Sequence, residues 1–140
     1  MSLLYISYRT PTASNIYTAY FNGSNWSGIT KHSSLANNSP NMVVFKNRLY
    51  LVYRALNTYD LYIGYYDGSS WHSGTKISVG GKVLQSFGSP GVAVFNNRLY
   101  LVYRGPNAYD LYTAYYDGTG WYGNTKIPIQ AGSNPGVAVF

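Results

Sequence analysis

Residues 98–123 read RLYLVYRGPNAYDLYTAYYDGTGWYG, and this stretch decides the fold because the chain repeats it. Residues 48–74 carry RLYLVYRALNTYDLYIGYYDGSSWHSG, and residues 3–28 carry a looser copy, LLYISYRTPTASNIYTAYFNGSNWSG. Internal repeats of about 40 to 50 residues are typical of propellers and solenoids. In each copy an arginine lies seventeen residues before a tryptophan: Arg9 and Trp26, Arg54 and Trp71, Arg104 and Trp121.

Each repeat contains short runs rich in Tyr, Val, Leu and Ile that end at Gly, Asn, Asp or Pro, the pattern of strands and turns. The second copy predicts four strands, and its Asp67-Gly68 pair suits a tight hairpin between the last two. The predicted strands of this copy are 41–45, 48–54, 60–66 and 71–77.

The strands are apolar or aromatic on both faces. In the strand predicted over 48–54, Leu49, Leu51 and Tyr53 alternate with Tyr50 and Val52. A sheet with one face in water would alternate apolar and polar residues, whereas the blades of a β-propeller are small antiparallel sheets covered on both sides. A flat sandwich of two sheets is the alternative, but it does not explain why the four-strand unit repeats whole.

The sequence therefore predicts an all-β chain that holds three blades' worth of a β-propeller. We expect a single propeller segment over residues 1–140. Its parts are the last three strands of blade 1 (3–31), blade 2 (40–77), blade 3 (90–127) and a first strand over 135–140.

The first repeat has no strand before 3–9, and the strand at 135–140 has no repeat after it. Propellers close with about four blades or more, and an open stack would expose apolar faces and a sheet edge. We therefore expect ring closure by association, with 135–140 of one chain completing blade 1 of the next. A homodimer would have six blades and a homotrimer nine, and two-fold dimers are the commonest closed oligomers.

The spacing between repeats is uneven in one place. Fourteen residues separate Trp26 from Pro40, but nineteen separate Trp71 from Pro90. The five extra residues fall within 79–88, between blades 2 and 3. Such an insertion is typical of a surface loop that can carry function, for which a protein partner is one candidate.

Composition limits the partners. The net charge of +6 comes from few acids, and its ten basic residues are spread over the repeats and form no basic tract, so we expect no nucleic-acid partner. No apolar run approaches the roughly 18 residues of a membrane span, and no secretory signal is recognisable, so we expect a soluble protein of undetermined location. The absence of cysteine excludes disulfides and thiolate metal sites.

The acidic residues argue against an enzyme. The chain has no glutamate, and Asp60 and Asp67 lie at opposite ends of one predicted strand, roughly 20 Å apart. A glycosidase pair needs about 5 to 10 Å. His32 and His72 occupy unrelated places in their repeats and have no repeated acid partner. We therefore expect no catalysis, no cofactor and no metal site.

The Asp-Gly-x-x-Trp turn, preceded by an aromatic strand, resembles the blade repeat of bacterial and fungal fucose-binding lectin propellers, some of which assemble from short chains. A more distant resemblance is to kelch-type blades, although Tyr-Arg stands where kelch has two glycines. The lectin resemblance covers about a dozen positions per repeat and implies a lectin-like role. It places the stacking aromatics at Trp26, Trp71 and Trp121 and at Phe21, Tyr66 and Tyr116, with Arg54 and Arg104 as possible replacements for the family's arginine.

Two candidate sites follow. One is the cleft between blades, where tryptophan and tyrosine would stack on a sugar ring, with packing between blades as the alternative. The other is the rim at Arg54 and Arg104, with an ion pair between Arg54 and Asp60 as the alternative. The first function hypothesis is a multivalent, non-catalytic carbohydrate-binding module that gains avidity from repeated sites. The second is a structural or engineered propeller fragment that self-assembles and has no specific ligand.

Overall fold

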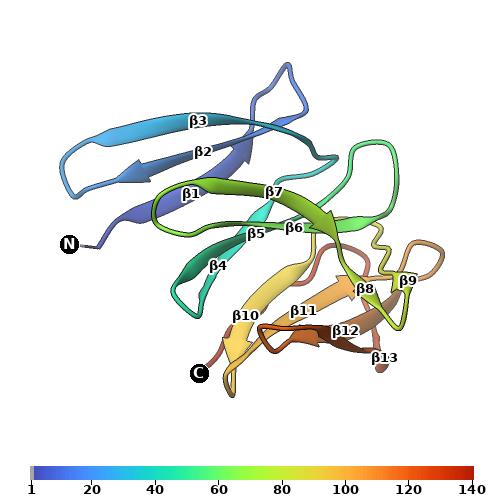
Figure 1. Ribbon diagram of the computed structural model, residues 1–140. Coiled ribbons are helices and arrows are strands. Elements are labelled where there is room, and N and C mark those ends of the chain that lie inside the picture. The colour runs from blue at the N-terminus through green and yellow to red at the C-terminus, as the bar shows by residue number, and fades with distance from the viewer. Residues whose placement is uncertain (1) are drawn as a thin grey trace.

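The chain folds into antiparallel β-sheets that stack face to face (Figure 1). The computed structural model describes residues 2–140, and that part contains no helix. We call the three large sheets blades 1 to 3. Blade 1 has β1 (Leu4–Arg9), β2 (Asn15–Phe21) and β3 (Trp26–Leu35); blade 2 has β4 (Asn41–Phe45), β5 (Arg48–Arg54), β6 (Leu61–Tyr66) and β7 (Trp71–Lys76); blade 3 has β10 (Gly91–Phe95), β11 (Arg98–Arg104), β12 (Asp110–Tyr116) and β13 (Trp121–Gln130).

Within each blade, consecutive strands pair in sequence order, so every connection is a hairpin. The register repeats between blades: Tyr53 pairs with Tyr62 as Tyr103 pairs with Tyr112. Predicted strands 41–45 and 48–54 coincide with β4 and β5, whereas β6 begins one residue later than expected and β7 ends one residue earlier. Blade 1 has three strands, and a fourth small sheet consists of β8 (Ser78–Val79) and β9 (Lys82–Val83).

Local sequence explains the turns. Lys46 and Asn47 both have positive φ, 47° and 60°, as a two-residue hairpin with the right-handed twist of the strands requires. After β6, Asp67 accepts hydrogen bonds at Oδ1 from the amides of Ser69 and Ser70, at 2.8 and 2.9 Å. The adjacent Gly68 has φ of 101°. The predicted Asp-Gly turn is therefore present, with the aspartate holding its backbone.

The main core lies between blades 2 and 3. Leu99 and Leu101 of β11 are completely buried against blade 2. A second cluster lies between blades 1 and 2, where Leu51 and Tyr53 pack with Ile16 and Ala36. Blade 2 is thus covered on both faces, which accounts for its apolar residues on both sides of β5.

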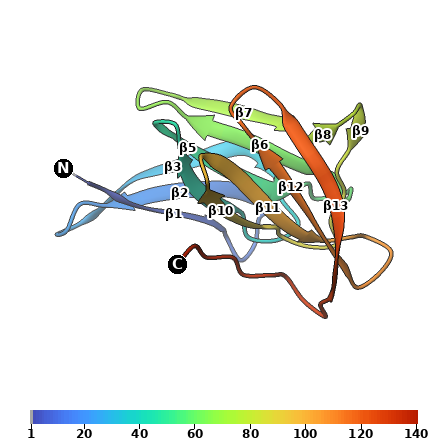
Figure 2. The same cartoon turned by 90° about the horizontal axis from the view of Figure 1, so that it is seen from below.

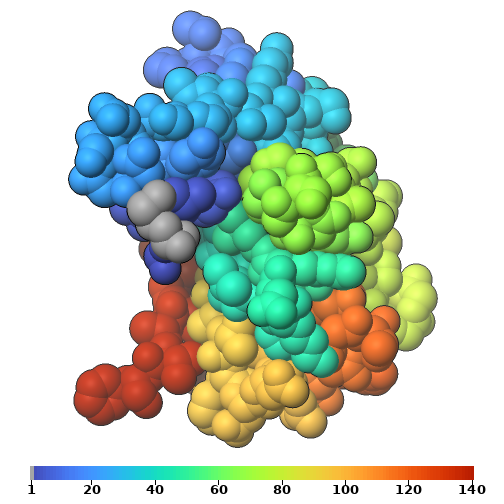
Figure 3. Space-filling view, turned by 60° about the vertical axis from the view of Figure 1, so that its left-hand side comes forward, coloured from blue at the N-terminus to red at the C-terminus, as the bar shows by residue number. Residues whose placement is uncertain are grey.

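Residues 135–140 form no strand within the chain. They run beside β10, as Figure 2 shows, and end in an arm that projects from the body in Figure 3. The first residue of this segment, Pro135, makes a contact with β10 that resembles the contact between Pro90 and β4. Asn41 of β4 donates through Nδ2 to the carbonyl of Pro90 at 2.6 Å, and a Cβ added to Gly91 of β10 would lie 2.9 Å from the carbonyl oxygen of Pro135. The segment therefore starts where the innermost strand of a further blade would start.

Candidate functional site

A cleft of about 230 Å³ opens between blades 2 and 3. Blade 3 contributes Trp121 and Tyr116, two of the residues singled out in the sequence. Blade 2 supplies the facing wall, mainly from β5, β6 and β7. The principal residues of that wall are Arg48, Tyr50, Ile63, Tyr65, Ser73, Thr75 and Lys76.

Aromatic rings line both sides of this cleft. Trp121 stacks on Tyr116 with ring centroids 5.2 Å apart and 29° between the planes. Across the cleft, the Arg48 guanidinium lies 4.4 Å from the centroid of Tyr65, and this ring also packs against His72 at 4.4 Å and Tyr50 at 5.8 Å. This wall therefore combines aromatic rings with a cation that has no acid partner within residues 2–140.

Lys76, a polar residue of the cleft wall, is held by an ion pair. Lys76 Nζ lies 3.0 Å from Asp60 Oδ2. The bond from Gln85, followed by that from Lys76, lowers the pKa of Asp60, and the same carboxylate raises the pKa of Lys76. Blade 3 repeats the pair with Lys126 and Asp110 at 3.1 Å. The expected alternative at the rim, an ion pair between Arg54 and Asp60, is therefore wrong, because the aspartate bonds across its own sheet.

Between blades 1 and 2 the equivalent space is filled. Trp71 and Tyr66 repeat the ring pair at 5.2 Å, but the His32 ring stands edge-on to Trp71, with centroids 4.9 Å apart. His32 Nε2 is bonded to the buried Thr18 hydroxyl at 2.9 Å. Burial lowers the pKa of His32, which favours a neutral ring at pH 7. Trp71 is therefore a packing residue in this part of the chain.

The third ring pair, Trp26 and Phe21, has centroids 5.2 Å apart and lies on the open face of blade 1, where Trp26 is 52% exposed. No blade of the described chain faces this pair. The three predicted pairs thus share one geometry, and the pair in blade 3 lines the cleft described above, to which the other two pairs do not contribute.

The predicted arginines lie at the other end of the blades and join one blade to the next. Arg54 donates through Nη1 to Asn37 Oδ1 and to the carbonyl of Phe87, both at 2.8 Å. Arg104 donates through Nη1 to the carbonyl of Gly132 at 3.0 Å. Arg9 bonds to the carbonyl of Asn37 in the same way. In every repeat the acceptor carbonyl lies three residues before the proline that precedes a first strand.

Sequence reasoning missed the wall opposite Trp121. Arg48, Tyr50 and Tyr65 face the same neighbour because β5 and β6 alternate sides and pair in register. The alternation of side chains along the strands shows that these three residues share one face of blade 2. The sequence does not show which face of a blade packs against the next blade, so it cannot tell which residues lie opposite the tryptophan.

Across residues 2–140, no three histidine or aspartate side chains gather as a metal site would require. The same residues include no long apolar helix of the kind that crosses a membrane. No family model matches the chain, and no curated protein matches it.

Proposed function

We propose that this chain is a non-catalytic, carbohydrate-binding β-propeller module that uses clefts between blades. The observation that supports the proposal is the cleft in which Trp121 of blade 3 meets Arg48 and Tyr65 of blade 2. Pyranose rings stack their C–H faces on aromatic side chains and offer hydroxyls to hydrogen-bonding groups. Thr75, Ser73 and the Arg48 guanidinium supply such groups along one wall of the cleft.

A glycan array tests this function. We expect one class of neutral glycan to bind, and Trp121→Ala and Arg48→Gln to reduce that signal. Arg48 is exposed, so its substitution tests the site with little change in packing. Lys82→Gln removes a charge at the distant β8–β9 hairpin and serves as the control. An array without any signal would contradict the lectin proposal and favour the alternative, a structural propeller fragment with no ligand.

We further propose that another copy of the chain covers the open faces of blades 1 and 3. The internal stacking supports this. Tyr50 packs against Tyr116 of the next blade with centroids 6.0 Å apart, and Tyr5 packs against Tyr66 at 6.2 Å. Tyr100 is the equivalent residue of blade 3, and its side faces no further blade.

The outer face of blade 1 also exposes an apolar residue. Leu4 is 59% exposed, whereas Leu99, at the same position in blade 3, is completely buried against blade 2. Stacking blade 1 of one copy on blade 3 of another would bury both open faces by the contacts already used inside the chain. Residues 136–140 would then pair with β1 as the innermost strand that blade 1 lacks.

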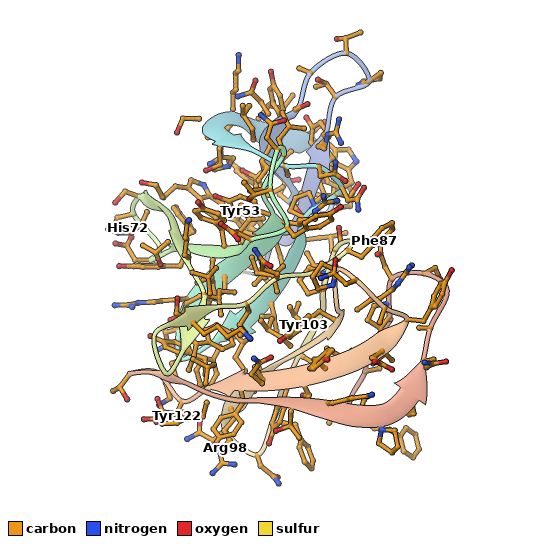
Figure 4. All side chains as sticks on the ribbon, turned by 90° about the vertical axis from the view of Figure 1, so that its right-hand side faces the viewer. Tyr53, His72, Phe87, Arg98, Tyr103 and Tyr122 are labelled. Atoms are coloured by element: carbon orange, nitrogen blue, oxygen red, sulfur yellow. The ribbon has the colours of Figure 1, made fainter. Side chains whose placement is uncertain are left out.

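Closure would also form a further cleft. Arg98 lies 4.4 Å from the Tyr115 centroid, as Arg48 lies over Tyr65, and Figure 4 shows Arg98 and Tyr122 on the open side of blade 3. Trp26 of a second copy would face this wall as Trp121 faces Arg48. A two-fold dimer gives six blades and is the assembly we propose; a trimer would give nine.

The mass in solution tests closure. Light scattering should give twice the chain mass of 15.6 kDa for the dimer. Three times that mass would replace the dimer by the nine-bladed ring. A monomer at micromolar concentration would contradict closure altogether, whatever the glycan array reports.

A further inference from the structure

The five-residue insertion contains a short β-hairpin. The hairpin β8–β9 turns at Gly80 and Gly81, which have φ of 58° and 79°, and it leads into Leu84, which is buried in the main core. The Leu84 amide donates to the carbonyl of Ile77 at 2.8 Å, and its carbonyl accepts from the Leu61 amide at 3.0 Å. Leu84, directly after the hairpin, is thus bonded to Ile77 and to Leu61 of blade 2.

A pocket of about 270 Å³ lies between this hairpin and blade 3. A pocket of this size suits a ligand no larger than a single sugar or amino acid. Its principal lining residues are Lys82 and Gln85 from the insertion, Tyr103, Tyr112 and Asn124 from blade 3, and Asn107 from the β11–β12 loop.

Blade 2 shows why the pocket is specific to this place. Tyr53 and Tyr62 stack at 5.6 Å, just as Tyr103 and Tyr112 stack at 5.8 Å. Between blades 1 and 2, however, Tyr53 is packed against Ile16 and the linker, and no insertion holds the neighbouring segment away. Figure 4 shows Tyr53 and Tyr103 at corresponding positions within the stack.

Two donors of the pocket, the Lys82 ammonium and the Asn124 amide nitrogen, have no acid partner within residues 2–140, whereas Gln85 donates to Asp60 Oδ1 at 3.0 Å. The Tyr103 hydroxyl donates to Asn124 Oδ1, which fixes the amide, and the Asn124 amide nitrogen donates to no residue in 2–140. Lys82 forms no ion pair within the same residues. Asp60 pairs with Lys76 and Asp110 pairs with Lys126, and neither carboxylate lines the pocket.

We infer that this pocket is a second binding site, which takes a small acidic sugar that places its carboxylate at Lys82 and Asn124. The ring of the sugar lies against Tyr112, the outer ring of the stacked pair. A carboxylate supplies the acceptors that the lysine and the amide lack, and charge-assisted hydrogen bonds favour it over a neutral hydroxymethyl group. The site uses none of the tryptophans and goes beyond the proposed function.

Calorimetric titration of the full chain with sodium glucuronate tests the inference, with glucose as the uncharged probe. We expect one glucuronate per chain and clearly weaker binding of glucose. Lys82→Gln should weaken glucuronate binding by about tenfold or more, as loss of a charge-assisted bond predicts. Lys82→Arg should retain most of the affinity, and Asn124→Gly, which installs the residue of blade 2, should lower it.

Lys31→Gln is the matched control, because it removes one exposed lysine charge on β3 of blade 1, which lines neither cleft, and should leave glucuronate binding unchanged. Glucuronate binding that is absent, equal to that of glucose or insensitive to Lys82→Gln would overturn the inference. A silent glycan array together with Lys82-dependent glucuronate binding would reject the proposed function and leave this inference standing.

Discussion

Phe45 and Phe95 occupy the same position in successive repeats, yet Phe45 is 3% exposed and Phe95 is 50% exposed. The difference comes from the neighbour. Phe45 meets Tyr116 of blade 3 at 6.3 Å between ring centroids, whereas Phe95 lies beside residues 137–140 at an open face. The same residue type is therefore a core residue in blade 2 and an exposed residue at the open face of blade 3.

Substitution of the two phenylalanines should separate folding from assembly. Phe45→Ala should lower the free energy of unfolding by about 3–5 kcal/mol, because it leaves a cavity between blades. Phe95→Asp should leave the blades folded but reduce the mass measured by light scattering to that of one chain, because it places a charge in the proposed interface. Urea unfolding and light scattering report the two effects. An unchanged assembly mass for Phe95→Asp would contradict the proposed closure.

Arg54 should act mainly on stability. Arg54→Gln removes the bonds to Asn37 and to the Phe87 carbonyl, so we expect unfolding to become easier by about 1–3 kcal/mol. Arg54→Lys should not restore the loss, because a single ammonium does not reproduce the fork of the guanidinium. Arg48→Gln is the control for removal of an arginine. Unchanged stability with lost glycan binding would instead make Arg54 the ligand-binding arginine suggested by the lectin resemblance.

Asp117 should contribute to acid unfolding. The Gly120 and Thr119 amides, with the Thr119 hydroxyl, lower the pKa of Asp117 to about 2. Because the folded pKa lies below the unfolded value of 3.8, the stabilisation is complete above pH 4 and is lost as the pH falls from about 4 to about 2.

Asp117→Asn keeps the turn without the titration, since Asn22 already holds the same turn in blade 1 through its Oδ1. Chemical unfolding at pH 5.5 and pH 2.5 should therefore show a smaller loss of stability for the variant. An equal loss in both proteins would show that Asp117 is not linked to the acid transition.

Gly74 should be intolerant of a side chain. A Cβ at this position would overlap with the hydroxyl oxygen of the buried Tyr53, whereas Asn124 stands at the same place in blade 3. Gly74→Ala should destabilise the chain by about 1–3 kcal/mol through overpacking, measured by thermal and urea unfolding. Gly132→Ala, where an added Cβ meets nothing within 4 Å, is the control and should be nearly neutral.

The repeat determined the blades. Alternating apolar residues and Asp-Gly turns act over a few residues, so β4, β5 and the turn at Asp67 could be read from the sequence. The three ring pairs, such as Trp121 with Tyr116, were also predictable, because turn and strand fix both positions locally.

The tertiary structure alone decided what each repeated residue does. Because blade 1 lies against one face of blade 2, His32 covers Trp71, whereas Trp121 of blade 3 lines an open cleft. The same stacking brings Arg54 to the carbonyl of Phe87, in the linker between blades 2 and 3. The insertion could be located by counting residues, but the pocket behind Lys82 depends on how the hairpin is held against blade 3. Local sequence repeats specify hydrogen bonding within a sheet, whereas contacts between sheets depend on residues some 50 positions apart that no repeat encodes by itself.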